Sequence, residues 1–112
     1  MITKDLVAAS SKPLILSILA QRESYGYEII KKVRELSNNQ INWKDGMLYP
    51  VLHKLESEKL IESFWHTAEN GRKRKYYKIK PKGKSILETE KTQWKIVNNA
   101  LKNLWETKPC LS

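Results

Sequence analysis

The 112-residue sequence contains a single cysteine, Cys110, and no long run of apolar residues. One thiol cannot form a disulfide within the chain or supply a cysteine-based zinc site, and it fits the reducing cytoplasm. The longest largely apolar stretch, residues 14–20, is far shorter than the about 20 residues of a membrane-spanning helix. Because Asp5 precedes this stretch and Gln21, Arg22 and Glu23 follow it directly, a secretory signal is not expected either. We therefore predict a cytoplasmic protein that does not enter a membrane.

Residue patterns typical of enzymes are also missing. The four glycines are scattered at positions 26, 46, 71 and 83, so they form no glycine-rich phosphate loop. Neither a nucleophile–base pair nor a carboxylate pair is apparent. His66 has no second histidine or acid pair beside it, as a metal site would need. We therefore predict that the protein is not an enzyme and uses no cofactor and no metal.

Acidic residues are absent where basic residues accumulate. The chain has 21 Lys and Arg against 12 Asp and Glu, a formal net charge of +9. Residues 70–87 contain no acid, so this segment carries nearly all of the excess charge. Such a run is either a solvated strand face or, as we expect here, a surface for nucleic acid. Its eight cations are Arg72, Lys73, Arg74, Lys75, Lys78, Lys80, Lys82 and Lys84.

Two short helices are predicted before residue 40. Pro13 suits a first helical turn, so the first helix is expected over residues 12–21 with Ser10 or Ser11 as its cap. The preceding stretch, residues 3–9, is weakly helical and is expected to form a separate turn or arm. A second helix, capped by Ser24, places its apolar residues on one face and its cations on the other.

A third helix is predicted from Asp45, which can cap it, to about residue 58. Pro50 must lie in or just beyond the first turn, where its missing N–H costs least. The opposite, polar face of this helix also carries His53 and Lys54, with Tyr49 on its flank. Its apolar face follows the i, i+3, i+4, i+7 rule with Leu48, Val51, Leu52 and Leu55.

A basic β-hairpin is predicted from two extended runs, residues 61–68 and 72–80. The Asn70-Gly71 pair between them is a strong signal for a two-residue type I′ turn. This turn would place Trp65 opposite Tyr76 and Phe64 opposite Tyr77, whereas a three-residue loop would shift the register. Paired aromatics of this kind favour sheet packing over a platform for stacking nucleobases.

The last helix is predicted from residue 81 or 82 to Trp105. Its apolar positions alternate in spacings of three and four, as in a coiled-coil seam, with Glu90 as one break. This apolar surface is wider than one small domain can cover, so we expect a homodimer in which two such helices pack together. The seam residues expected at the interface are Leu87, Trp94, Val97, Leu101 and Leu104.

Together these elements predict a mainly α protein with a small β-hairpin (α+β), a winged helix-turn-helix with a C-terminal dimerisation helix. Residues 1–80 would form the DNA-binding region, with 1–11 as an N-terminal arm. Residues 81–107 would form the dimerisation helix, and 108–112 a tail.

The third helix and the hairpin, or wing, are the predicted contacts to duplex DNA. A helix about 10 to 12 Å across fits the major groove, so base contacts are expected from Tyr49, Pro50, His53 and Lys54, with Met47 and Lys44 as neighbours. The wing cations Arg72, Lys73, Arg74 and Lys75 alternate across a strand, so about half should face the phosphates. A winged helix that binds RNA or the ribosome is the alternative.

Four strings of residues also carry a family resemblance. They are Tyr25–Ile29, Gly46–Glu56, Leu60–Trp65 and Gly71–Ile79, the last followed by Pro81 and Gly83. In this order and spacing, over about residues 12–105, the chain resembles the PadR family of transcriptional regulators. Its single C-terminal helix is similar to the compact subgroup of that family. Tyr25, in the first string, is included among the expected DNA contacts.

The resemblance implies a homodimeric repressor that binds a palindromic operator and is released by a small-molecule effector. In compact members that bind drugs, a tryptophan of the last helix stacks on planar aromatic molecules at the dimer centre. Trp94, eleven residues after Gly83, occupies the matching position. Those members have an acid four residues later, where this chain has Asn98, so cationic ligands are less expected. The alternative is that Trp94 serves only as a seam residue of the dimer.

Overall fold

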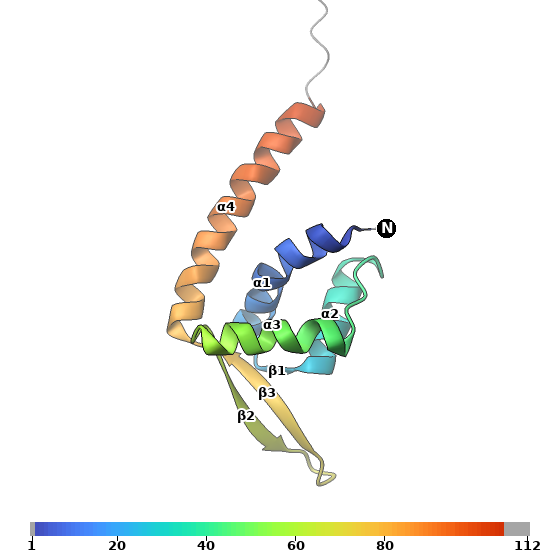
Figure 1. Cartoon of the computed structure of the whole chain (residues 1–112), viewed down its shortest axis with the longest axis vertical. Coiled ribbons are helices and arrows are strands. Elements are labelled where there is room, and N and C mark those ends of the chain that lie inside the picture. Colours follow the sequence, from blue (N-terminus) through green and yellow to red (C-terminus); the bar gives the residue numbers. More distant parts are fainter. Residues whose placement is uncertain (1, 107–112) are drawn as a thin grey trace, which may run out of the picture.

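The computed structural model describes residues 2–106 and contains four helices and one three-stranded antiparallel sheet (Figure 1). This is the α+β winged-helix arrangement that the sequence predicts. The predicted tail, residues 108–112 with Cys110, lies outside the described residues, as does residue 107. In chain order the elements are α1 (Lys4–Gln21), β1 (Ser24–Tyr25), α2 (Gly26–Leu36), α3 (Asp45–Ser57), β2 (Ile61–Thr67), β3 (Lys73–Ile79) and α4 (Pro81–Glu106).

Helix α1 is longer than predicted, because the expected arm and the first helix form one element. Thr3 caps it, and its Oγ1 accepts a hydrogen bond from the Leu6 N–H at 3.3 Å. The prediction that Ser10 or Ser11 caps a helix beginning near Pro13 is therefore wrong. Both serine hydroxyls instead donate to carbonyl groups one turn earlier, and Pro13 lies inside the helix.

The starts of α2 and α3 each differ from the prediction by one residue. Ser24 does not cap α2, because its backbone pairs with Tyr77 in strand β1. Tyr25 precedes the helix, and its N–H donates to the Glu28 carboxylate at 3.4 Å. In α3, Lys44 occupies the cap position and Asp45 lies in the first turn, where its charge complements the helix dipole.

The hairpin has a three-residue loop, so the predicted register is wrong by one residue. Phe64 pairs with Tyr76 and Trp65 pairs with Lys75. A type I′ turn needs positive φ at both loop residues, but of Asn70 and Gly71 only Gly71 has it, at 82°. The Asn70 side chain instead accepts a hydrogen bond from the Arg72 N–H at 3.0 Å. Strand β1, which was not predicted, pairs with β3 and gives the sheet order β1-β3-β2.

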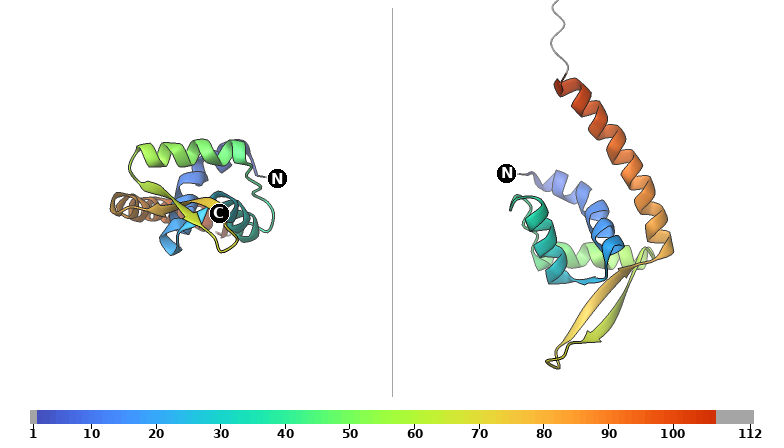
Figure 2. Two further views of the ribbon diagram at one scale, coloured as in Figure 1. Left: turned by 90° about the horizontal axis from the view of Figure 1, so that it is seen from below. Right: turned by 180° about the vertical axis from the view of Figure 1, so that it is seen from behind.

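The core lies where α1, α2 and α3 meet the base of the sheet, and α4 contributes only its first turns. Leu87 of α4 is 2% exposed, whereas residues 91–100 are all exposed. The rest of α4 projects from the body on the side away from the wing (Figures 1 and 2). The fully buried side chains include Ile15, Leu16, Ile29, Leu48, Leu52 and Tyr77.

Candidate nucleic-acid interface

The outer face of α3 carries the side chains that the sequence predicts to read bases. Pro50, His53 and Lys54 are exposed, and Tyr49 is 38% exposed. Lys44 is exposed at the start of the helix. The inner face is fixed by buried leucines, so this outer face has one orientation relative to the body. Of the two predicted neighbours, Met47 is half-buried and packs against the core rather than joining the exposed face.

Tyr49 is held in place by its close approach to α2. A Cβ atom placed on Gly26 would lie 2.6 Å from the Tyr49 hydroxyl oxygen, which is closer than packed atoms allow. Gly26 does not have positive φ, so the space for Tyr49, and not backbone conformation, calls for glycine here. Gly26, in the Tyr25-Gly26-Tyr27 string, therefore leaves room for the ring of a candidate DNA contact on α3.

One face of the wing lies on the same side as α3. The Ser63 hydroxyl donates to the Glu56 carboxylate of α3, which shows that this face of β2 points toward the helix. Side chains two residues apart on a strand, and those directly paired across strands, share a face. Trp65 therefore lies on this α3-facing side of the wing, together with its partner Lys75 and with Lys73.

The opposite face of the wing is an aromatic cluster centred on Tyr76. The Tyr76 ring is 5.3 Å from the Tyr25 ring and 5.9 Å from the Phe64 ring, between centroids. The Arg74 guanidinium lies 4.5 Å from the centroid of the Tyr25 ring, within the range of a cation–π contact. These aromatics pack the sheet, and they place Arg74 and Tyr25 together where the wing meets α2.

Trp65 is the exposed aromatic that sequence reasoning did not include in the interface. Its side chain is 67% exposed, unlike the half-buried Phe64 and Tyr76. The predicted register paired Trp65 with Tyr76, which implied packing. Side chains on a strand alternate with a period of two, so Trp65 shares a face with Ser63. A three-residue loop would then have paired Trp65 with Lys75.

The basic segment divides into two groups of cations. The run from Arg72 to Lys75 occupies the outer part of the wing. By contrast, Lys78 pairs with Glu62 at 3.1 Å, and the Lys82 ammonium donates to the Glu58 carbonyl after the end of α3 at 3.2 Å. Two of the four cations outside this run thus have partners within the described chain, which makes the outer wing the stronger candidate for phosphate contacts.

Tyr77, behind this interface, has a buried hydroxyl group with no hydrogen-bond partner in the described chain. Burial raises the pKa of the Tyr77 phenol above its ordinary value, and the nearby Tyr49 and Glu56 side chains add to the shift. Well below pH 10 the phenol is neutral in both the folded and the unfolded chain. Above that pH the unfolded chain loses the proton first, so stability falls as the pH rises toward the higher folded pKa.

We expect Tyr77→Phe to leave the free energy of unfolding at pH 7 unchanged or to raise it by up to about 1 kcal/mol. The reason is that the substitution removes a buried hydroxyl group without a hydrogen-bond partner. The substitution should also reduce the loss of stability above pH 10. Urea unfolding at pH 7 and pH 10.5 measures both effects. A destabilisation of more than about 2 kcal/mol at pH 7 would show instead that the hydroxyl group has a partner.

The exposed part of α4 carries most of the predicted dimer seam. Trp94 is 37% exposed, Val97 53% and Leu104 72%, while Leu101 is half-buried. Leu87 does not belong to this exposed seam, because it is buried in the core of its own chain. The break in the seam also has a local explanation: Glu90 pairs with Lys12 of α1 at 3.6 Å. Asn98 is exposed beside Val97.

Among the described residues, no three His, Cys, Asp or Glu side chains gather closely enough to hold a metal ion. None of the described helices combines the length and the apolar content that crossing a membrane would take.

Comparisons with known proteins agree with this fold. The family model for the transcriptional regulator PadR-like family matches residues 15–89. A solved PadR-like transcriptional regulator from Bacillus cereus is 33% identical with a TM-score of 0.84, over 94% of this chain and 100% of that one. A PadR family regulator from Clostridium difficile is 35% identical with a TM-score of 0.76, over 86% and 98%. The Escherichia coli transcriptional regulator YqjI is 29% identical over 80% of this chain and 41% of its own length. These relatives are transcriptional regulators and not enzymes.

Proposed function

Because the chain belongs to the PadR-like family of transcriptional regulators, whose members act on DNA, we propose that it is a homodimeric repressor of palindromic operators. The observation that carries this proposal is that two surfaces lie on the same side of the protein. They are the exposed face of α3 and the wing face with Trp65, Lys73 and Lys75. One duplex can contact both surfaces at once.

In this proposal α3 enters the major groove and the wing follows the adjacent backbone. Tyr49, Pro50, His53 and Lys54 are the base-contacting candidates, because they are the exposed residues of the helix that the groove admits. Lys73 and Lys75 neutralise phosphates, which strengthens binding to any sequence. Arg74 and Tyr25, packed against each other on the opposite face of the wing, flank the duplex where the wing meets α2.

The dimer forms through the exposed seam of α4. Trp94, Val97, Leu101 and Leu104 would lose their remaining exposure against a second α4, since their own chain leaves each of them at least partly uncovered. Two-fold symmetry then sets the two α3 helices about 34 Å apart, in successive major grooves of one face of the duplex. Repression follows when the bound dimer occludes a promoter.

Binding to RNA is the alternative function, since a basic wing alone does not distinguish the two nucleic acids. A deep, narrow major groove prevents A-form RNA from admitting α3. The test is a competition in which labelled duplex DNA is displaced by unlabelled duplex DNA or by hairpin RNA of equal length. The proposal expects duplex DNA to compete at least about tenfold better, and equal competition would contradict the role of α3.

We also propose that a planar aromatic effector binds between the two copies of Trp94 at the dimer centre. The partial exposure of Trp94 within the seam supports this, because an indole face available there can stack on a flat ring. Asn98, one turn later, offers an amide rather than a charge, so neutral aromatics fit better than cations.

Planar aromatic dyes should quench tryptophan fluorescence of the dimer, and Trp94→Leu should abolish most of the quenching while the dimer persists. Trp105→Leu is the matched control, since Trp105 is 77% exposed near the end of the described part of α4. If quenching is the same in both variants, or the dye leaves DNA affinity unchanged, Trp94 does not hold an effector.

A further inference from the structure

Trp65 lies on β2 with most of its ring in solvent. Its side chain is 67% exposed, although tryptophan is a large apolar side chain that is usually well covered. Among residues 2–106, no aromatic ring contact and no cation–π contact involves Trp65. The rings that pack the sheet lie on its opposite face, and they include Phe64, Tyr76 and Tyr25. Packing within the described chain therefore does not account for a tryptophan at this position.

Two cations lie beside Trp65 on the α3-facing side of the wing. Lys75 is its direct partner on β3, and Lys73 is a diagonal neighbour on the same face. Directly paired Cβ atoms are about 4.5 to 5.5 Å apart, and diagonal neighbours are about 7 to 8 Å apart. The Lys75 ammonium lies 5.8 Å from the centroid of the Tyr77 ring, toward the base of the sheet, rather than over the indole. The indole ring is thus open to a partner that the two lysines also attract.

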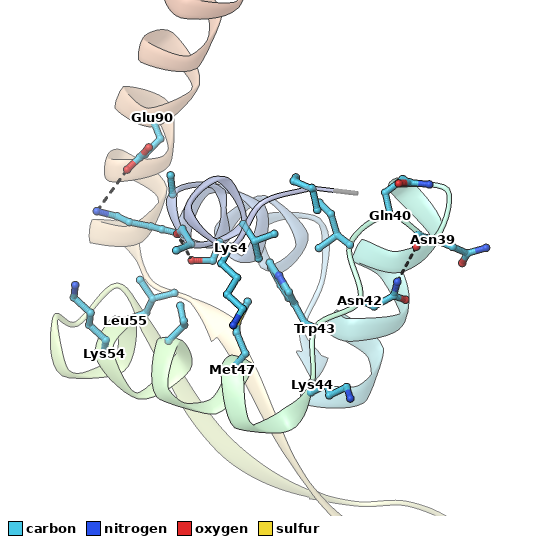
Figure 3. A pocket seen from close by; sticks show the side chains of 18 of the residues that line it. Lys4, Asn39, Gln40, Asn42, Trp43, Lys44, Met47, Lys54, Leu55 and Glu90 are labelled. Atoms are coloured by element: carbon cyan, nitrogen blue, oxygen red, sulfur yellow. Dashed lines mark hydrogen bonds and ion pairs between the residues drawn. The ribbon is translucent and has the colours of Figure 1, made fainter.

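The charge of this surface fits a polyanion. The wing face consists of three positions on each strand, and none of the six is an acid. Helix α3 adds Lys44 at its start and Lys54 in its last turn (Figure 3). The Glu56 carboxylate borders the face at its base, where it accepts the hydrogen bond from Ser63. A duplex whose phosphates meet the wing lysines would bring its sugars against the ring of Trp65.

The backbone of a duplex offers an indole ring two kinds of contact. The bases of a duplex are stacked on one another, so their flat faces are closed to the ring. The deoxyribose between two phosphates presents C–H groups to the apolar face of an indole, and a phosphate oxygen can accept from the indole N–H. Because Trp65 lies within β2 and not in the loop, its ring lies along the backbone rather than projecting as a wedge between base pairs.

We propose that Trp65 packs against deoxyribose beside the phosphates that Lys73 and Lys75 neutralise, and that its indole N–H donates to a phosphate oxygen. This inference rests on the proposed function, since it requires that the wing meets duplex DNA. Burial of a neutral ring releases no counterions, so the contact holds the wing on DNA at any salt concentration. The lysines beside it supply the salt-dependent part of the affinity. One face of the wing thus combines two kinds of contact.

Fluorescence anisotropy with a labelled duplex, at several salt concentrations, separates these two kinds of contact. Trp65→Ala should lower the affinity of the dimer on the order of 100-fold, or about tenfold for each wing. Its slope of log affinity against log salt should equal that of the wild-type protein. Lys75→Ala, on the same face, should instead make the slope shallower by about 2, because the dimer loses one phosphate contact in each wing.

Two further variants control for the loss of a ring and for a structural effect. Trp105→Ala removes the same side chain from another exposed position, 77% exposed in α4, and should leave DNA affinity unchanged. Trp65→Phe retains an apolar ring and should bind at least about fivefold more tightly than Trp65→Ala. A purely structural role of Trp65 would displace the wing cations too, so Trp65→Ala would then change the slope and lower the urea midpoint.

Wild-type duplex affinity in Trp65→Ala, or a slope as shallow as that of Lys75→Ala, would overturn the role of Trp65 and leave the proposed function standing. A loss of affinity for single-stranded DNA alone would show that the ring stacks on bases, and it would also overturn the sugar contact. A wild-type protein that binds no duplex would instead contradict the proposed function. The two failures are therefore distinguishable.

Discussion

Replacing the four wing cations Arg72, Lys73, Arg74 and Lys75 with alanine is expected to lower affinity for every duplex on the order of 1,000-fold at 0.1 M salt. The reason is counterion release, since each phosphate neutralised by a cation contributes about 0.9 to the slope of log affinity against log salt. If two of the four cations in each protomer face the duplex, the dimer loses four contacts and the slope becomes shallower by about 3 to 4. Fluorescence anisotropy with a labelled duplex at several salt concentrations measures both quantities.

The four side chains are not expected to contribute equally to the loss of DNA affinity. Lys73 and Lys75 share the α3-facing side of the wing, so the pair Lys73→Ala and Lys75→Ala should account for most of the lost slope. Arg74→Ala should also loosen the contact with Tyr25, since its guanidinium lies over that ring. A charge-matched control replaces Lys31, Lys32, Lys91 and Lys95 with alanine. If the control lowers DNA affinity as much as the wing variant does, DNA affinity depends on the net charge of the protein and not on the wing.

Introducing aspartate at Val97 and Leu101 is expected to convert the dimer into a monomer and to lower operator affinity by about 100- to 10,000-fold. The second half-site then no longer benefits from the high effective concentration that a linked pair provides. Val97 is 53% exposed and Leu101 half-buried on the projecting part of α4, so the protomer core should remain folded. Sedimentation equilibrium should give the mass of one chain, 13.1 kDa, in place of twice that mass.

Asn99→Asp is the matched control for this variant. It adds a charge to the same stretch of α4 but about half a helical turn away from Val97, outside the seam. It should leave both the mass and the DNA affinity unchanged. A dimer that survives the substitutions at Val97 and Leu101 would show that another surface joins the two chains.

The elements with strong periodic patterns were predictable from sequence. The leucines of α3 follow the helical repeat and are buried, which fixed the orientation of Tyr49, Pro50, His53 and Lys54 without any tertiary information. The break in the α4 seam was also visible in the sequence, although only the structure shows that Glu90 forms an ion pair with Lys12.

The features that sequence reasoning missed depend on contacts between distant segments. Strand β1 is two residues long and exists only because Ser24 and Tyr25 pair with β3. Leu87 fits the seam by spacing, but the first turns of α4 lie against the core, which buries it. Trp65 was assigned to packing because the register was wrong by one residue, and such a slip moves each side chain to the other face.

The most direct test of the dimeric DNA-binding function is selection of bound sequences from a library of random duplexes. Inverted repeats whose half-site centres lie about 10 base pairs, or 34 Å, apart should be enriched. The variant with aspartate at Val97 and Leu101, which is expected to be a monomer, should fail to enrich them. Enrichment of single half-sites without symmetry would contradict binding as a dimer, and no enrichment of duplex DNA by the intact protein would contradict DNA binding.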